Sequence, residues 1–213
     1  LLDLNDFVLV SSLILASTSD RRKNLLKQIG IYPSKIIDPE LDESSFKNIN
    51  PTKLVVELAF EKALAVKKKI NIKNKKYFIV AGDTIVYRAK KFYNKTNELK
   101  KIKDYLKELS GKKHFVYGGI CVIDCSGNVY KRLVKSEVYF DLLSDNELSS
   151  HVLLNEGIGK AGGYAIQGTG AKFIRKIRGS YSNVVGLCLN SLYKILTNIG
   201  FKNWNFLSLV VIT

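Results

Sequence analysis

Apolar and polar residues alternate along the chain with the periods of strands and helices. Residues 13–16 form a short apolar run typical of a buried strand, and an apolar stripe at helical spacing follows within residues 25–29. The hydroxyl residues 17–19 can cap that helix, and Gly30 can end it. The beginning of the pattern therefore predicts a strand, a polar loop and a helix.

A second helix is predicted to begin at Asn50 and Pro51, because proline favours the first helical position. Its buried stripe runs from Leu54 to Ala63. The acidic cluster 38–43 precedes this helix. In so basic a chain the cluster is a candidate cation site, and an ordinary acidic loop is the alternative.

Extended runs are predicted from apolar patterning at residues 77–81, 84–87, 115–123 and 130–140. The first run ends in Gly82-Asp83-Thr84, which places Asp83 near a strand end, where α/β folds bind ligands. The last two runs are joined by a hairpin signal at residues 126–128, so we expect them to pair antiparallel.

Further helices are predicted after Thr96 or Asn97, at a capping box in residues 144–147, and around residues 192–196. Helices between strands of mixed order predict an α/β fold with a mixed, partly antiparallel central sheet and flanking helices. We expect a single domain over residues 1–213, with a cleft between two lobes and an N-terminal extension at residues 1–11.

The composition fits a globular protein with a full core, since 46% of the 213 residues are hydrophobic. The net charge of +15 would attract polyanions. The lysine runs are typical of solvated faces, however, and few aromatic residues lie among them, so the sequence does not favour nucleic-acid binding. No apolar run is long enough for a membrane span.

Cysteine and histidine do not form a metal-binding pattern. Three cysteines, which we expect to be buried thiols, predict neither a zinc site nor a disulfide framework and suit a reducing, cytoplasmic location. His114 is expected on a strand and His151 on a helix, neither as a metal ligand. The apolar segment 206–212 has the length of a strand, and residues 1–10 show no signal peptide.

Glycine is concentrated in residues 156–170, around Lys160 and Gln167. Such a segment lets the backbone approach a ligand closely while two polar side chains point at it. We interpret it as the floor of a site for a phosphorylated small molecule, and a purely structural loop is the alternative.

Reaction of a nucleoside triphosphate requires cationic groups, a divalent metal such as Mg²⁺ or Mn²⁺, and a carboxylate that holds the metal or orients water. The chain offers this set. The cationic candidates are Arg21, Arg22, Lys95 and Lys160, the carboxylates are Glu43 and Asp83, and the neutral groups are Ser17, Ser19, Thr84, Gln167 and Asn183. P-loop, Rossmann and nucleophile-elbow motifs are absent from the sequence.

These segments, in their order and spacing, resemble the Maf family of nucleoside triphosphate pyrophosphatases. The motifs that carry the resemblance are Leu15–Arg22, Asp42-Glu43, Gly82–Thr84, Asn94–Thr96, Leu109–His114, Lys160–Gly168 and Gly179–Cys188. The resemblance covers about residues 12 to 200. It implies a Maf/ITPase-like fold, a homodimer, and metal-dependent hydrolysis between the α and β phosphates.

The resemblance also implies residue roles. Asp83 matches the family's proton acceptor, placed to activate water or hold the metal together with Glu43. Glu43, Lys95 and Gln167 match the other residues of the catalytic pocket, and Arg21, Thr84 and Gln167 match positions linked to substrate choice. On physical grounds we assign Ser17, Arg22 and Lys160 to the phosphates, with Ser19 and Asn183 as further substrate contacts.

Asp83-Thr84 together with the segment from Lys160 to Gln167 is similar to the branch of the family that acts on dTTP and UTP. The departures from the motifs are Asp20, Gly82, Asn94, Thr96 and Cys188. One alternative is a pyrophosphatase for modified or deaminated purines. Another is a nucleic-acid-binding or cell-division regulatory protein that uses its basic surface.

Overall fold

The computed structural model describes residues 11–43, 46, 50–71 and 76–202. Residues 1–10 of the predicted extension and the predicted strand at 206–212 lie outside this part of the chain. Within it, the chain forms one seven-stranded sheet in the order β2-β1-β3-β5-β6-β7, with β4 paired to β3. The strands are β1 (Ser12–Leu15), β2 (Lys35–Ile36), β3 (Tyr77–Arg88), β4 (Lys91–Phe92), β5 (Lys113–Asp124), β6 (Val129–Phe140) and β7 (Ile174–Arg178).

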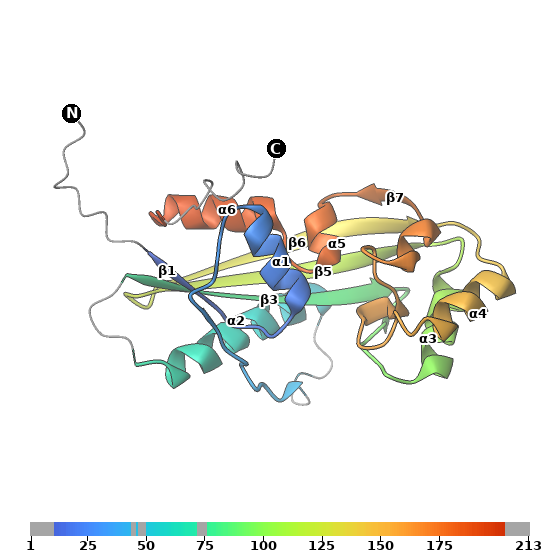
Figure 1. The fold of residues 1–213 in the computed structure, drawn as a ribbon, viewed down its shortest axis with the longest axis horizontal. Coiled ribbons are helices and arrows are strands. Elements are labelled where there is room, and N and C mark those ends of the chain that lie inside the picture. The colour runs from blue at the N-terminus through green and yellow to red at the C-terminus, as the bar shows by residue number, and fades with distance from the viewer. Residues whose placement is uncertain (1–10, 44–45, 47–49, 72–75, 203–213) are drawn as a thin grey trace.

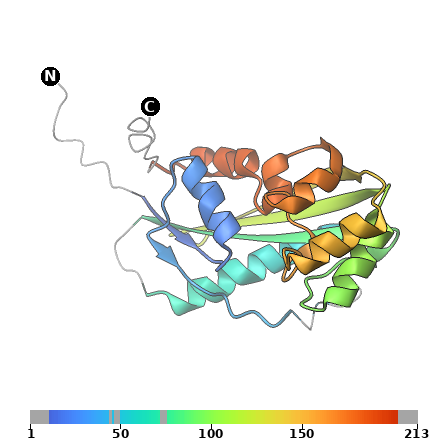
Figure 2. The same cartoon turned by 45° about the vertical axis from the view of Figure 1, so that its right-hand side comes forward.

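Helices cover both faces of the sheet, as Figures 1 and 2 show. They are α1 (Asp20–Gln28), α2 (Pro51–Lys69), α3 (Leu99–Leu109), α4 (Asp145–Leu153), α5 (Tyr181–Val185) and α6 (Leu189–Asn198). Helix α2 lies on one face, where it shares a core with β1, β3 and β5. Helices α1 and α6 pack on the opposite face, and α3 and α4 lie together at one end.

The pairing confirms the predicted fold class. Strand β1 runs parallel to β2 and β3, whereas β3, β5, β6 and β7 pair antiparallel in sequence. Asn50 caps α2 by accepting from the Thr52 amide, and Ser144 and Glu147 form the predicted capping box. The sheet is therefore mixed and partly antiparallel with flanking helices, as the apolar pattern indicated.

The prediction that Asp83 lies near a strand end is wrong. Strand β3 continues through it, because Gly82, Asp83 and Thr84 keep their register opposite Ile120, Gly119 and Gly118 of β5. The two extended runs expected at 77–81 and 84–87 are thus one strand of 12 residues. The polar pair looked like a break in the sequence, but both residues sit in the middle of the strand.

The edge of β3 opposite β5 explains why the strand accommodates the polar residues Asp83 and Thr84. Strand β1 ends at Leu15, which pairs with Val80, and β4 pairs with Tyr87 and Arg88. Among the described residues, the stretch of β3 between these two partners has a strand neighbour on the β5 side alone. This gap in the sheet gives side chains from both faces access to the middle of β3.

Glycine at two neighbouring positions of β5 sets how closely the helices approach the sheet. A Cβ atom on Gly119 would overlap the backbone carbonyl of Val55 in α2, and one on Gly118 would overlap the Asn183 side chain. Backbone of a helix cannot move aside as a flexible side chain can. Gly119 therefore fixes the distance between α2 and β5.

The Gly119→Ala protein is expected to lose about 3 kcal/mol of unfolding free energy, because α2 must shift away from β5 to admit the methyl group. The control is Gly159→Ala, whose Cβ meets no atom within 4 Å and which carries only the cost of its φ of 65°, about 1 kcal/mol. Urea unfolding of both variants measures the difference. Equal midpoints would contradict the close packing of α2.

Candidate active site

A cavity of about 540 Å³ opens beside the gap in the sheet. Its walls come from the β1–α1 loop, residues 38–43, β3, residues 159–167 and residues 184–186. It brings together most of the predicted site residues, namely Ser17, Ser19, Arg21, Arg22, Glu43, Thr84, Lys95, Lys160 and Gln167. Segments far apart in the sequence thus line one space.

Asp83 lines a second cavity, of about 600 Å³, which adjoins the first. Alternation along β3 explains the separation, because Asp83 points to the α2 face and Thr84 to the opposite face. The two cavities share the walls formed by Glu43, Thr84 and Lys95. We therefore expect a ligand in the first cavity to approach Asp83 along these shared walls.

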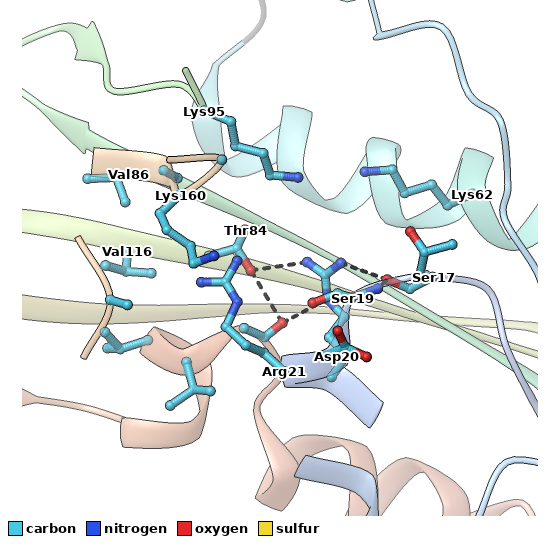
Figure 3. A pocket seen from close by; sticks show the side chains of 18 of the residues that line it. Ser17, Ser19, Asp20, Arg21, Lys62, Thr84, Val86, Lys95, Val116 and Lys160 are labelled. Atoms are coloured by element: carbon cyan, nitrogen blue, oxygen red, sulfur yellow. Dashed lines mark hydrogen bonds between the residues drawn. The ribbon is translucent and has the colours of Figure 1, made fainter. Parts of the chain in front are cut away.

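Cationic side chains dominate the first cavity. Figure 3 shows the amino groups of Lys62, Lys95 and Lys160 and the guanidinium of Arg21 directed toward its interior. Burial, followed by repulsion from Arg22, lowers the pKa of Arg21. An anion bound here would relieve this repulsion and exchange lost hydration for charge-assisted hydrogen bonds.

Lys62 of α2 joins the two candidate carboxylates. Its Nζ lies 2.7 Å from Oε1 of Glu43 and 2.6 Å from Oδ1 of Asp83. Lys62 and Asp83 are buried, whereas the Glu43 side chain is half exposed. The pairing gives the buried Asp83 carboxylate a cationic partner beside the cavity and brings Glu43, from a distant loop, to the same place.

The sequence analysis missed Lys62, although a signal was present. Within α2, Lys62 is four residues after Leu58 and four before Val66, both buried. A lysine on the apolar stripe of a helix is rarely buried without an acidic partner. That position could have identified Lys62 as a partner of a carboxylate in the core.

Arg22 serves the architecture of the site rather than lying free in the cavity. Its Nε donates to the Gly186 carbonyl at 3.0 Å, Nη1 donates to Ser17 Oγ at 3.1 Å, and Nη2 donates to Thr84 Oγ1 at 3.4 Å. Burial lowers the pKa of Arg22, and the charges of Asp83 and Glu43 oppose that shift. The guanidinium ties the β1–α1 loop to β3 and to the end of α5.

Asn183 is not among the residues that line the two cavities, and its predicted substrate contact stays a prediction. Its Nδ2 donates to the Val116 carbonyl at 3.1 Å and to Ser136 Oγ at 3.0 Å, and the residue is 1% exposed. These bonds fasten α5 to β5 and β6. Asn183 thereby positions Gly186, whose carbonyl receives Arg22.

Backbone hydrogen bonds connect the loops that carry Lys95 and Lys160. The amide of Gly159 donates to the Thr96 carbonyl at 3.0 Å, and the amide of Gly162 donates to the Tyr93 carbonyl at 2.9 Å. Each bond lies within two residues of both lysines. The glycine-rich floor and the β4–α3 loop therefore form one wall that carries both lysines.

Glu43 and Asp83 are the predicted ligands of a divalent cation, and in this structure both pair with Lys62 Nζ. Glu43 and Asp83 converge on one point, Lys62 Nζ, but no group of three or more acidic, histidine or cysteine side chains forms a metal cluster among the described residues. Mg²⁺ often takes one or two protein carboxylates and completes its shell with phosphate oxygens and water. Glu43 and Asp83 suit that arrangement.

The acidic cluster at 38–43 divides between two tasks. Glu40 pairs with Lys69 at 2.7 Å on the surface, whereas Glu43 faces Lys62. The cluster was predicted as either a cation site or an ordinary acidic loop, and the surface pairing of Glu40 is that of an ordinary acidic loop. Glu43 alone from this cluster reaches Asp83 through their common partner.

His114 and the three cysteines do not line either cavity. His114 is buried, its Nε2 lies 2.7 Å from the Tyr164 hydroxyl, and burial lowers its pKa to about 3. All three cysteines are free thiols; Cys121 and Cys188 are buried, but Cys125 is exposed in the β5–β6 turn, which corrects the expectation of three buried thiols.

No helix in the described ranges has both the length and the apolar character that crossing a membrane requires.

The pH dependence of substrate capture is expected to report Lys95. Burial lowers its pKa, an effect strengthened by Lys62 and Arg22 and opposed by Asp83 and Glu43. Since the charged form attracts phosphate, kcat/KM should fall as pH rises through this lowered pKa, below the ordinary value of about 10.4. In Lys95→Arg the fall should move to higher pH, and an unchanged profile would exclude Lys95 from binding.

Comparison with known families decides the relationship. Residues 12–199 match the family described as Maf-like protein. The chain belongs to the Maf family. Maf proteins similar to it include a dTTP/UTP pyrophosphatase of Sphingopyxis alaskensis, which is 41% identical over 189 residues, 89% of this chain and 97% of that protein.

Two further Maf relatives cover the chain to a similar extent. A dTTP/UTP pyrophosphatase of Chelativorans sp. is 38% identical over 199 residues, 91% of this chain and 95% of that protein. A nucleoside triphosphate pyrophosphatase of Rickettsia felis is 39% identical over 196 residues, with the same two shares. The name of neither protein refers to nucleic-acid binding or to cell division.

Proposed function

We propose that this Maf protein hydrolyses nucleoside triphosphates to the monophosphate and pyrophosphate, with dTTP and UTP as preferred substrates. The observation that carries the proposal is the single cavity in which Arg21, Lys95 and Lys160 meet beside the Glu43–Lys62–Asp83 cluster. The two pyrimidine-nucleotide pyrophosphatases that are similar over most of the chain support the substrate class.

The cationic wall provides the phosphate site. Arg21, Lys95 and Lys160 come from three segments and surround the space with positive charge, which favours a polyanionic tail. Ser17 and Thr84 are already oriented by Arg22. The expected substrate contacts of Ser17, Ser19, Thr84 and Gln167 remain predictions, supported by their place in the cavity wall.

Asp83 is proposed as the proton acceptor. Water would bond to the α-phosphorus, its proton would pass to the Asp83 carboxylate, and the bond to the oxygen bridging the α and β phosphates would break to release pyrophosphate. Lys62 pairs with Asp83 at 2.6 Å and with Glu43 at 2.7 Å, and thereby holds the two carboxylates near each other. A Mg²⁺ or Mn²⁺ ion held by Glu43 and Asp83 would neutralise phosphate charge.

Pyrophosphate release across a panel of triphosphates tests this function. The panel contains dTTP, UTP, the other canonical nucleotides and deaminated or modified purines, each with Mg²⁺, with Mn²⁺ and with a chelator. We expect the highest kcat/KM with dTTP and UTP and its loss with the chelator. Highest activity on modified purines would instead support a pyrophosphatase for modified or deaminated purines. No pyrophosphate release from any nucleotide would refute hydrolysis. The cytoplasmic location and the homodimer stay predictions.

A further inference from the structure

His151, near the end of α4, contacts both ends of a loop that lines the cavity. Its Nε2 lies 3.1 Å from the carbonyl oxygen of Gly163, and its Nδ1 lies 3.0 Å from the hydroxyl oxygen of Thr169. The residues between these two contacts are 164–168, and positions 164 to 167 all line the cavity, Gln167 among them. The imidazole ring therefore closes the base of the loop that presents Gln167.

The hydrogen-bond partners define the tautomer of this ring. A carbonyl oxygen can only accept, so Nε2 carries the hydrogen and donates to Gly163. Burial is the main cause that lowers the pKa of His151, opposed by the Gly163 carbonyl and Glu156 and assisted by Lys172. Nδ1 lies 3.0 Å from the Thr169 hydroxyl oxygen, and that hydroxyl donates its one hydrogen to Oε2 of Glu156.

Thr169 is held from a second side by Glu156. The Oε2 atom of Glu156 accepts from the Thr169 amide at 2.6 Å and lies 3.0 Å from the Thr169 hydroxyl. Gly168 has no side chain because a Cβ there would overlap the same carboxylate. His151 and Glu156 thus grip Thr169 from two sides at the end of the loop.

Two glycines in the left-handed conformation lead into the loop. Gly162 and Gly163 have φ angles of 77° and 73°, which favour glycine and impose little rigidity of their own. The ring of His151 is fully buried and packs edge-on against Phe173, with centroids 5.1 Å apart. The two contacts of this buried ring, with the Gly163 carbonyl and the Thr169 hydroxyl, form a clamp at the base of the loop.

We propose that His151 is a positioning residue, which holds residues 164–168 so that Gln167 meets the substrate. This inference rests on the proposed function, because the substrate at that wall is a nucleoside triphosphate. His151 itself does not touch the cavity. It acts through the Gly163 carbonyl and the Thr169 hydroxyl.

Four variants test the clamp. His151→Phe keeps the ring packing and loses both polar contacts, whereas His151→Gln retains a donor and an acceptor on one side chain. Thr169→Val removes the hydroxyl alone, and the fourth variant combines His151→Phe with Thr169→Val. We expect kcat/KM for dTTP to fall about tenfold in His151→Phe and in Thr169→Val. The double variant should fall no further, because both substitutions break the same contact between His151 and Thr169.

Rescue separates positioning from packing. We expect His151→Gln to recover kcat to within about threefold of the wild type, at similar thermal midpoints for all variants. Wild-type kcat/KM in His151→Phe would overturn the proposal. Equal impairment of His151→Gln and His151→Phe at unchanged thermal midpoints would overturn it too, since the role would then belong to the imidazole shape.

Amide hydrogen exchange tests the clamp independently of enzymatic activity. We expect amides within residues 160–170 to exchange about tenfold faster in His151→Phe, with α2 and β5 unchanged, because local opening becomes easier. Unchanged exchange there would refute the clamp even in a protein that hydrolyses triphosphates. If the wild type releases no pyrophosphate, the proposed function fails, and faster local exchange would still support the clamp.

Discussion

The Asp83→Asn protein is expected to fold normally and to release pyrophosphate at least about 100-fold more slowly than the wild type, since general-base catalysis contributes roughly 10²- to 10⁴-fold. The amide occupies the same space but cannot take a proton from water. Glu43 still pairs with Lys62 at 2.7 Å, so the lysine keeps an acidic partner. Initial rates of pyrophosphate release with saturating dTTP measure the effect.

The matched control is Asp104→Asn, an exposed aspartate on α3 away from both cavities. It should have wild-type rates, which separates loss of a particular carboxylate from loss of net charge. A thermal midpoint close to that of the wild type would show that Asp83→Asn is folded. Retained turnover in the folded Asp83→Asn protein would remove Asp83 from its role.

The Lys62→Met protein is expected to lose both activity and stability. Without the ammonium group, Asp83 becomes a buried carboxylate that lacks its salt bridge, which costs about 3 kcal/mol when one partner of a buried pair is removed. Glu43 also loses the contact that draws it to the site. We expect about 100-fold slower pyrophosphate release, because two reacting-site carboxylates are displaced together. Urea unfolding and dTTP hydrolysis measure the two effects.

Two comparisons make this expectation specific. Lys68→Met removes an exposed lysine from the same helix and should change neither quantity. The double variant Lys62→Met with Asp83→Asn should be more stable than Lys62→Met alone, because it leaves no uncompensated charge in the interior. A Lys62→Met protein as stable as the wild type would show that the buried pair does not need its cation.

Much of the fold follows from local sequence signals. The apolar run at 13–16, the cap at Asn50 and the capping box at Ser144 each act over a few neighbouring residues, so a single sequence predicts them. The interruption of β3 at Asp83 was predicted wrongly for the same reason. Whether a polar pair breaks a strand depends on the neighbouring strand, and β5 continues opposite it.

Residue type and motif spacing identified the residues that line the cavity. They did not identify the separate role of each residue. Arg22 and Asn183 carry polar groups that suit a ligand, and the structure shows that these groups also bond to protein carbonyls and hydroxyls. The partners of Lys62 lie 19 and 21 residues away in the sequence, and those of His151 lie 12 and 18 residues away. Such pairings depend on how α2 and α4 pack, which local patterns do not specify.

A crystal structure with a non-hydrolysable α,β-methylene analogue of dTTP and Mg²⁺ tests the central claim most directly. The account predicts the phosphate tail among Arg21, Lys95 and Lys160, with the α-phosphorus facing Asp83 through the gap beside β3. A nucleotide bound elsewhere, or one whose α-phosphorus lies on the side of the cavity away from Asp83, would contradict it.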